Sequence, residues 1–275
     1  AATGVYPIAP TPFTDGGDID WPSVDQMVGF YLRAKVHGLT ILGLMGEAQK
    51  LSESESAELV RRVLRGVGGR LPVIVGVSSP GTSNLVALGR IAMDAGACGV
   101  MIAPLTGLKT EAQIAAYFGE VIAALGPDIP VCYQDYPQSS QADISAAGFV
   151  KLADAHPSIV MFKHEDCPGL KKLTAVRRAC DGKAHRRISI FVGNGGLYIP
   201  QELQRGADGI ICGHIHHACD RRFGGIHYLN CGDWVESCTA LIETHAGELR
   251  IVHWKDDGSE RVQAGKEPQG AVAVA

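Results

Sequence analysis

One lysine in this sequence stands where its amine could react. Lys163 directly follows the apolar residues 159–162 in the stretch SIVMFKHEDCPG. An amine removed from water loses its proton more easily, and the neutral amine can attack a carbonyl carbon to form a Schiff base. The alternative is a lysine at a strand end that extends into solvent. Taken alone, the residue favours that second interpretation.

A glycine-containing turn is the second candidate, in the stretch GLMGEAQKLS. Glycine lets a backbone approach a ligand closely, and consecutive backbone N–H groups can hold a carboxylate. The residues of this candidate carboxylate site are Gly43, Leu44, Met45, Gly46 and Glu47. A tight connection between a strand and a helix would use the same glycines, so the turn alone does not identify a site.

A cluster of histidines and cysteines is the third candidate. His214, His216 and His217 lie between Cys212 and Cys219. Neutral imidazoles bind Mn, Fe or Zn, so His214 and His216 are candidate ligands of a divalent metal. A fortuitous affinity for Zn or Ni is the competing interpretation, and we favour it over an evolved catalytic metal.

Three polar residues follow the lysine directly: His164, Glu165 and Asp166. Side chains of these types could act as acid or base at the end of a strand. We expect them instead to cap the helix that follows, because acidic groups favour a helix N-terminus.

The elements that must position these residues alternate along the chain. Eight short apolar runs, each too short for a helix, predict strands buried on both faces at 4–10, 39–44, 72–77, 99–104, 129–134, 158–163, 188–193 and 208–213. Amphipathic segments predict helices between them, at 23–36, 51–67, 84–97, 111–125, 145–155, 169–180 and 199–207. Ser52 and Glu55 have the spacing of a capping box. The alternation predicts an α/β protein of the (β/α)8 TIM-barrel type over residues 1–210. A doubly wound open sheet is the competitor, but no G-x-G-x-x-G follows the first strand.

The alternation breaks after Gly213, where an eighth helix should come. Instead, residues 226–230, 238–244 and 249–254 have the composition of strands, with a hairpin turn at 245–248. We therefore expect a barrel that lacks its last helix, a β-rich segment over 211–256, and a disordered tail over 257–275.

Composition limits the classes of function. The chain has 275 residues, 46% of them hydrophobic, and a net charge of −4 without a basic tract, which argues against nucleic-acid and membrane partners. We expect neither a signal peptide nor a membrane-spanning helix. Four scattered cysteines lie in apolar or helical contexts and predict buried thiols in a reducing, cytoplasmic compartment: Cys98, Cys132, Cys167 and Cys180.

Several motifs of residues 4–210 together resemble the dihydrodipicolinate synthase / N-acetylneuraminate lyase family. They are TPF after the first strand, G-x-x-G-E and LS after the second, proline and valine around the fifth, the strand-six lysine, and GADGI at the eighth. The resemblance implies a class I aldolase barrel that needs no cofactor and is commonly oligomeric. It also implies that Lys163 forms a Schiff base with a small-molecule 2-oxo acid, that the Gly43–Glu47 turn binds the acid's carboxylate, and that Gly193 belongs to the substrate site.

The chain departs from the family pattern at several positions, among them Asp135 in place of an asparagine and a missing tyrosine after the fourth strand. Leu44 and Met45 stand where the family usually has two threonines, and Gln134 takes the place of a tyrosine that relays protons. Because neighbouring strand residues point to opposite faces, neither Tyr133 nor Tyr136 is expected to replace that phenol. A divergent lyase or hydratase acting on another 2-oxo acid therefore fits best, with Gln134 at a catalytic position. A barrel that has lost turnover is the alternative.

Residues 210–254 resemble the C-terminal end of calcineurin-like metallophosphoesterases of the UDP-2,3-diacylglucosamine pyrophosphohydrolase type. The stretches are ICGHIHHA, YLNCGDWVES, CTALIE and GELRIVHW. This resemblance implies that His214 and His216 bind metal in a phosphoesterase, but the required upstream D-x-H, G-D and G-N-H motifs are absent from the sequence. We interpret the chain as a chimera joined near residues 208–213, whether natural, engineered or an error of the gene model.

Overall fold

The structure is a computed structural model, and it describes residues 2–182, 185–194, 198–210, 218–223, 226–231, 239–244, 248–253 and 261–262. Its internal contacts divide the chain into two compact units, residues 1–213 and 214–275. We call them the barrel unit and the C-terminal unit and describe each by itself.

The barrel unit is built on a sheet of eight parallel strands. Their order is β1-β8-β7-β6-β5-β4-β3-β2, so the last strand lies beside the first. Backbone bonds close the ring between the two ends of this order, because Thr40 N donates to Pro7 O and Ala9 N donates to Thr40 O. The strands are β1 Gly4–Val5, β2 Leu39–Ile41, β3 Val73–Gly76, β4 Gly99–Ile102, β5 Val131–Asp135, β6 Ile159–His164, β7 Ser189–Val192 and β8 Gly209–Ile210. All eight predicted strands are confirmed.

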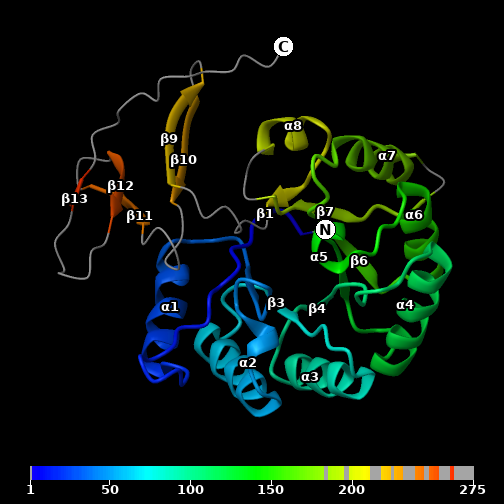
Figure 1. Cartoon of the computed structure of the whole chain (residues 1–275), viewed down its shortest axis with the longest axis horizontal. Helices are drawn as coiled ribbons and strands as arrows, with labels where there is room; N and C mark the ends of the chain where they lie inside the picture. The colour runs from blue at the N-terminus through cyan, green and yellow to red at the C-terminus, as the bar shows by residue number, and fades with distance from the viewer. Residues whose placement is uncertain are drawn as a thin grey trace. The chain divides into compact units, whose positions relative to one another are not determined.

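Most of the helices surround these strands, as Figure 1 shows, whereas one short helix, α5, is drawn within the ring. The helices are α1 Trp21–Arg33, α2 Glu53–Val67, α3 Thr82–Asp94, α4 Glu111–Leu125, α5 Pro137–Ser140, α6 Ala146–Ala155, α7 Leu170–Asp181 and α8 Ile199–Gln204, with a 3-10 turn, η1, at Ala48–Lys50. The capping box at the start of α2 is present, with Ser52 and Glu55 bonded reciprocally. The short helix α5 was not predicted; Pro137 at its first position pre-sets the helical φ.

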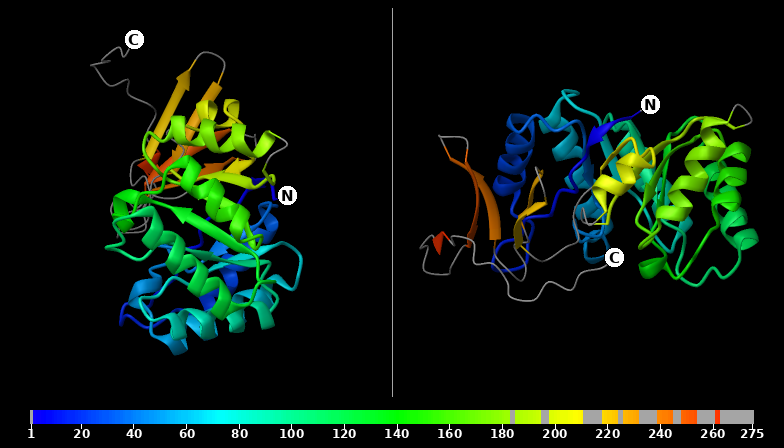
Figure 2. Two further views of the ribbon diagram at one scale, coloured as in Figure 1. Left: turned by 90° about the vertical axis from the view of Figure 1, so that its right-hand side faces the viewer. Right: turned by 90° about the horizontal axis from the view of Figure 1, so that it is seen from above.

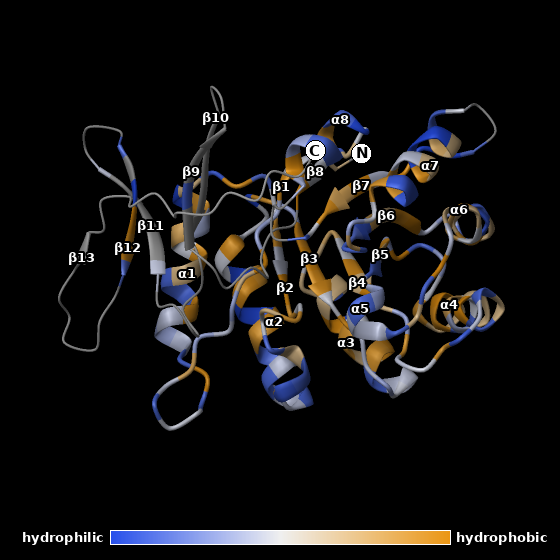
Figure 3. Cartoon of the chain, turned by 45° about the horizontal axis from the view of Figure 1, so that its top comes forward, coloured by the Kyte–Doolittle hydropathy of each residue, from blue (hydrophilic) through white to orange (hydrophobic). Residues whose placement is uncertain are grey.

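The core has two layers, as expected for strands buried on both faces. The larger layer lies between strands and helices; Figure 3 shows hydrophobic residues on the strands and on the helix sides that face them. The smaller layer fills the inside of the ring with residues of the strands and of the segment just after β1, namely Tyr6, Ile8, Ile74, Met101, Cys132, Met161 and Phe191. This two-sided burial confirms a (β/α)8 barrel.

The prediction that four scattered cysteines are buried is confirmed for two of them. Cys132 and Cys180 are buried, whereas Cys98 and Cys167 are exposed. Cys98 lies just before β4 and Cys167 in the connection after β6, so neither belongs to an element that is covered on all sides.

No helix among the described residues is long and apolar enough to cross a membrane.

No helix follows β8 in the part of the chain that the structure describes. The next described element is β9, Ala218–Phe223, and it belongs to the C-terminal unit with β10 Ile226–Cys231, β11 Thr239–Glu243, β12 Leu249–His253 and β13 Arg261–Val262. β9 and β10 form an antiparallel ribbon (Figure 2), and β11, β12 and β13 form a separate antiparallel sheet. β9 was not predicted as a strand because ACDRRF has neither an apolar run nor a regular alternation.

Candidate active site

The ends of β5 and β6 carry polar side chains to both faces of the barrel wall. The two strands pair in parallel, with Gln134 opposite Lys163 and Asp135 opposite His164. Side chains alternate along a strand, so Gln134 and Lys163 share the inner face with Cys132 and Met161 of the interior layer. Asp135 and His164 share the outer face, which packs against helices.

The inner face holds a buried amine, a carboxylate and an amide in contact. Lys163 Nζ lies 2.9 Å from Glu165 Oε1, and Gln134 Nε2 donates to Glu165 Oε2 over 2.8 Å. Lys163 is 1% exposed, Gln134 5% and Glu165 6%. We call these three residues the inner network. A buried ammonium needs a counter-charge, and Glu165 supplies it.

Gly193, directly after β7, leaves room for that carboxylate. A Cβ atom at this position would come within 2.6 Å of Glu165 Cγ, closer than real Cβ atoms approach. Its amide donates to His164 O over 3.1 Å, which fixes the backbone next to the inner network. The structure therefore places Gly193 against a side chain of the site, where any larger residue would displace Glu165.

The outer face holds a second set of charges, and it corrects the capping prediction. His164 is fully buried; its Nδ1 lies 3.0 Å from Asp135 Oδ2 and its Nε2 lies 3.0 Å from Gly169 O. The N-cap of α7 is Gly169, without a side-chain cap. The expectation that residues 164–166 cap this helix was wrong, because β6 extends through His164 and Glu165 turns inward to Lys163.

Lys172 of α7 completes the outer set. Its Nζ lies 2.8 Å from Asp143, 3.1 Å from Asp166 and 3.2 Å from Asp135. Burial opposes the charge on this amine, but the three carboxylates together raise the pKa of Lys172 above its usual value. We call Asp135, His164, Lys172, Asp143 and Asp166 the outer network, and it ties α7 to the ends of β5 and β6.

The glycine turn after β2 folds back on itself. Gly46 N donates to Gly43 O and Glu47 N donates to Leu44 O, each over 3.0 Å. Thr11, from the TPF motif, donates its hydroxyl to Gly46 O over 2.7 Å and is itself buried. The amides of Leu44 and Met45 have no such partner among the described residues, so they remain the donors that the turn can offer to a carboxylate.

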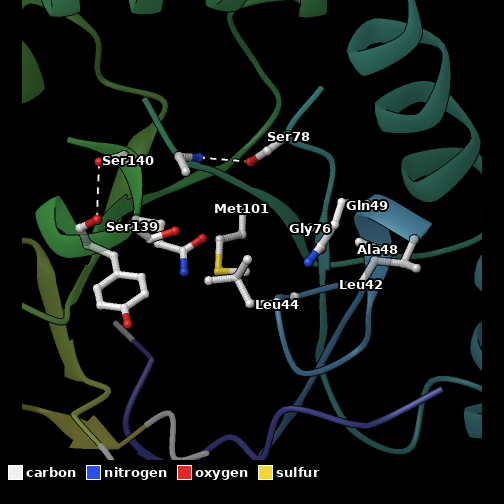
Figure 4. A pocket seen from close by; sticks show the side chains of 13 residues that line it. Leu42, Leu44, Ala48, Gln49, Gly76, Ser78, Met101, Ser139 and Ser140 are labelled. Carbon is white, nitrogen blue, oxygen red and sulfur yellow. Dashed lines mark hydrogen bonds between the residues drawn. The ribbon is translucent and has the colours of Figure 1, made fainter. Parts of the chain in front are cut away.

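The turn forms one wall of a pocket of about 290 Å³ at the C-terminal ends of β2 to β5. Its lining includes Leu42, Gly43, Leu44, Ala48, Gln49, Gly76, Ser78, Met101, Ala103, Gln134, Tyr136, Ser139 and Ser140. Figure 4 shows Leu44 and Met101 pointing into the space between Ser139 and Ser140 on one side and Gln49 on the other. None of these lining residues carries a formal charge at neutral pH. Gln134 belongs to both the pocket and the inner network, so it links the two.

The two tyrosines beside Gln134 differ in position. Tyr133 packs among Phe118 and Phe149 in the helix-facing layer, away from the pocket, as predicted. Tyr136 lines the pocket two residues after Gln134, so its exclusion on grounds of strand alternation was wrong. Burial, and then the nearby Glu165 carboxylate, raise the pKa of Tyr136.

Sequence reasoning singled out Lys163 but missed what it contacts. The signal was the spacing of Lys163 and Glu165, which places both on one face if the strand continues by one residue. The same spacing relates Gln134 to Tyr136.

His214 and His216 lie outside the described residues, so the predicted metal site stays a prediction. Among the described residues, no group of three or more His, Cys, Asp or Glu side chains could hold a metal ion.

Comparison with known proteins places the chain in a family. The sequence profile of the Dihydrodipicolinate synthetase family matches residues 1–248, which extends beyond residues 208–213, where the sequence suggested a join. A 4-hydroxy-tetrahydrodipicolinate synthase of Sorangium cellulosum is 30% identical over 211 residues, covering 76% of this chain and 67% of that protein. None of these matches supports a metallophosphoesterase-like segment.

Solved structures give the same result. The crystal structure of dihydrodipicolinate synthase from Rhodopseudomonas palustris is similar with a TM-score of 0.75 and 42% identity, covering 78% of this chain and 70% of that one. A prophage protein of the dihydrodipicolinic acid synthase family from E. coli K12, solved in complex with pyruvate, has a TM-score of 0.69 and 27% identity, with coverages of 76% and 69%.

Proposed function

This chain belongs to the dihydrodipicolinate synthetase family, and from that premise we propose that it is a Schiff-base lyase in which Lys163 condenses with a 2-oxo acid. The observation that carries the proposal is the position of the lysine. It is a fully buried amine at the C-terminal end of a barrel strand, the end at which TIM-barrel enzymes carry out their chemistry. A relative of the same fold was solved in complex with pyruvate, a small 2-oxo acid.

The pocket supports a substrate with one carboxylate and an uncharged remainder. The two amides of Leu44 and Met45 suit the carboxylate, since backbone N–H groups bind anions without a cationic side chain. The rest of the lining combines apolar groups such as Met101 with the hydroxyls of Ser78, Ser139 and Ser140. A second carboxylate would have no cation among these lining residues, and burying it unpaired would be costly. We therefore propose a 2-oxo acid whose far end is apolar or hydroxylated.

Trapping of the covalent intermediate tests this function. The protein is incubated with pyruvate and with longer uncharged and dicarboxylic 2-oxo acids, then reduced with borohydride, and the mass of the intact protein and of its peptides is measured. We expect an adduct on Lys163, greatest with an uncharged longer acid. EDTA should leave its yield unchanged, because no metal takes part in the proposed chemistry.

Lys163→Arg is the control, because arginine keeps a positive charge beside Glu165 and lacks a primary amine. We expect its adduct yield to fall by more than about 10³-fold. A correctly folded wild-type protein that gives no adduct with any acid would exclude the lyase and leave a barrel without turnover as the better account.

A further inference from the structure

We propose that Glu165 is the acid–base residue of the Lys163 reaction and carries each of its proton transfers. The inference rests on the proposed Schiff-base function, which it deepens by assigning a second catalytic residue. Its basis is the contact of both Glu165 carboxylate oxygens: one lies 2.9 Å from the amine of Lys163, and the other accepts a hydrogen bond of 2.8 Å from Gln134.

The resting lysine needs a base before it can react. A lysine paired with a carboxylate is held as an ammonium, and an ammonium has no electron pair with which to attack a carbonyl. Among the described residues, Glu165 is the ionisable group within hydrogen-bonding distance of Lys163 Nζ. Glu165 is therefore placed to receive the proton that the lysine must lose.

The proton steps balance with this one carboxylate. Glu165 takes a proton from Lys163 Nζ, and the neutral amine attacks C2 of the 2-oxo acid, forming the C–N bond as the carbonyl π bond breaks. The new alkoxide takes the proton from Glu165 to give a carbinolamine. Glu165 then removes a second proton from the nitrogen and donates it to the hydroxyl, which leaves as water. The products are a protonated Schiff base and one water molecule.

The same carboxylate is then free to continue the reaction. It has returned to its ionised form next to the new iminium, and it can remove a proton from C3 to give the enamine. That step requires a substrate with at least one hydrogen on C3, as pyruvate has. A carboxylate held close to the reacting nitrogen accelerates such transfers by about 10²- to 10⁴-fold.

The neighbouring polar groups are less suited to act as the base. The amide of Gln134 is not an effective acid or base at neutral pH, and its N–H holds Glu165 in place, so Gln134 is a positioning residue. Tyr136 lines the pocket, but burial and the Glu165 carboxylate raise the pKa of its phenol, so the phenol keeps its proton. Gly193 leaves the space that Glu165 occupies.

The test measures how fast the Lys163 adduct with pyruvate accumulates in the presence of cyanoborohydride, which reduces the iminium. Glu165→Gln is compared with Glu202→Gln, which removes another buried glutamate, in α8 and outside both the pocket lining and the inner network. Urea unfolding of each variant gives the folded fraction. We expect the rate per folded molecule to fall by at least about 100-fold in Glu165→Gln and to stay unchanged in Glu202→Gln.

A second variant separates a base from a structural residue. Glu165→Ala leaves a cavity beside Lys163, and added formate should raise its trapping rate by about 10-fold or more as the small carboxylate fills the missing position. Wild-type trapping by Glu165→Gln would overturn the inference while leaving the Schiff-base function intact. A slow Glu165→Gln without rescue of Glu165→Ala by formate would assign Glu165 a structural role and overturn it as well. Absence of an adduct in the wild-type protein would instead refute the function itself.

Discussion

The inner and outer networks occupy opposite faces of the same two strand ends. Residues alternate between them one by one: Gln134 inward and Asp135 outward on β5, Lys163 inward and His164 outward on β6. The inner network has a single cation and a single carboxylate next to an uncharged pocket. The outer network has three carboxylates around Lys172 and a histidine whose two ring nitrogens both have partners.

The difference follows from what each face must do. A site for Schiff-base chemistry needs one amine that can change its protonation state and a space for substrate beside it. The charges of the outer face connect β5, β6 and the start of α7. The pleat of a strand therefore places the residues of the proposed chemistry and those of the outer network on opposite faces, one peptide bond apart. Substitutions on the two faces should therefore have different consequences.

The largest effect on stability is expected for Lys172→Met. Loss of this amine leaves the Asp135 carboxylate, which is 1% exposed, with His164 as its remaining partner. Because breaking a buried ion pair leaves a buried charge uncompensated, the variant should lose about 3 kcal/mol of stability. For a unit of this size, that loss corresponds to a Tm lower by roughly 6–12 °C. Lys171→Met, an exposed neighbour in the same helix, is the matched control and should unfold like the wild type. Slower trapping at Lys163 per folded molecule of Lys172→Met would contradict the separation of the two faces.

The difference in unfolding free energy between wild type and Lys172→Met should also depend on pH. The three carboxylates raise the pKa of Lys172 in the folded protein above the ordinary value of 10.5. A raised amine pKa contributes stability that is fully present below the unfolded value and is lost as pH rises through the folded value. The free-energy gap between wild type and Lys172→Met should thus be constant from pH 7 to about 10 and shrink above 10.5. A gap that narrows below pH 9 would point to another titrating group.

Two glycines give a matched pair of smaller effects. In Gly193→Ala the new methyl displaces Glu165, and a misplacement of about 1 Å should slow trapping by about 10- to 100-fold with little loss of stability. In Gly169→Ala the methyl meets Asp166 O and the His164 ring, at a φ of +50° that alanine rarely adopts. We expect that variant to lose about 1–3 kcal/mol in urea unfolding and to keep its trapping rate. The opposite assignment of the two effects would refute the comparison.

Local patterns in the sequence were sufficient for the barrel. Runs such as residues 72–77 and 188–193 carry their own strand signal, and α4 begins and ends where the amphipathic pattern predicts, at Glu111 and Leu125. Lys163 was singled out by the motifs of residues 4–210 taken together, because taken alone it favoured a lysine that extends into solvent. β9 could not be predicted, because its residues are mostly polar and its pairing with β10 decides its conformation.

The partners of Lys163 depend on information that the sequence does not carry locally. Gln134 can contact Glu165, 31 positions further along the chain, only if the strand register sets Gln134 opposite Lys163. Predicting the contact also requires the last residue of β6 to be placed without error. A strand that ended at Lys163 would have left Glu165 free to cap α7. Register and strand ends are decided by tertiary packing, which explains why the elements were predicted and the network was not.

The smallest effect sharpens the boundary of the outer network. Glu202 of α8 is 2% exposed, and burial raises the pKa of its carboxyl although the nearby His164 opposes the shift. A raised carboxyl pKa means that the protonated form fits the fold better. The group therefore costs no stability well below pH 4.5, and it destabilises the fold increasingly as pH rises from about 4.5 to the folded pKa. Glutamine has no charge to bury, and Glu202→Gln should therefore be more stable than wild type at pH 7, on the order of 1 kcal/mol, with no advantage at pH 4. Urea unfolding at the two pH values measures this directly. A loss of stability at pH 7 would mean that Glu202 is a working partner of His164, and the outer network would then extend from α7 to α8.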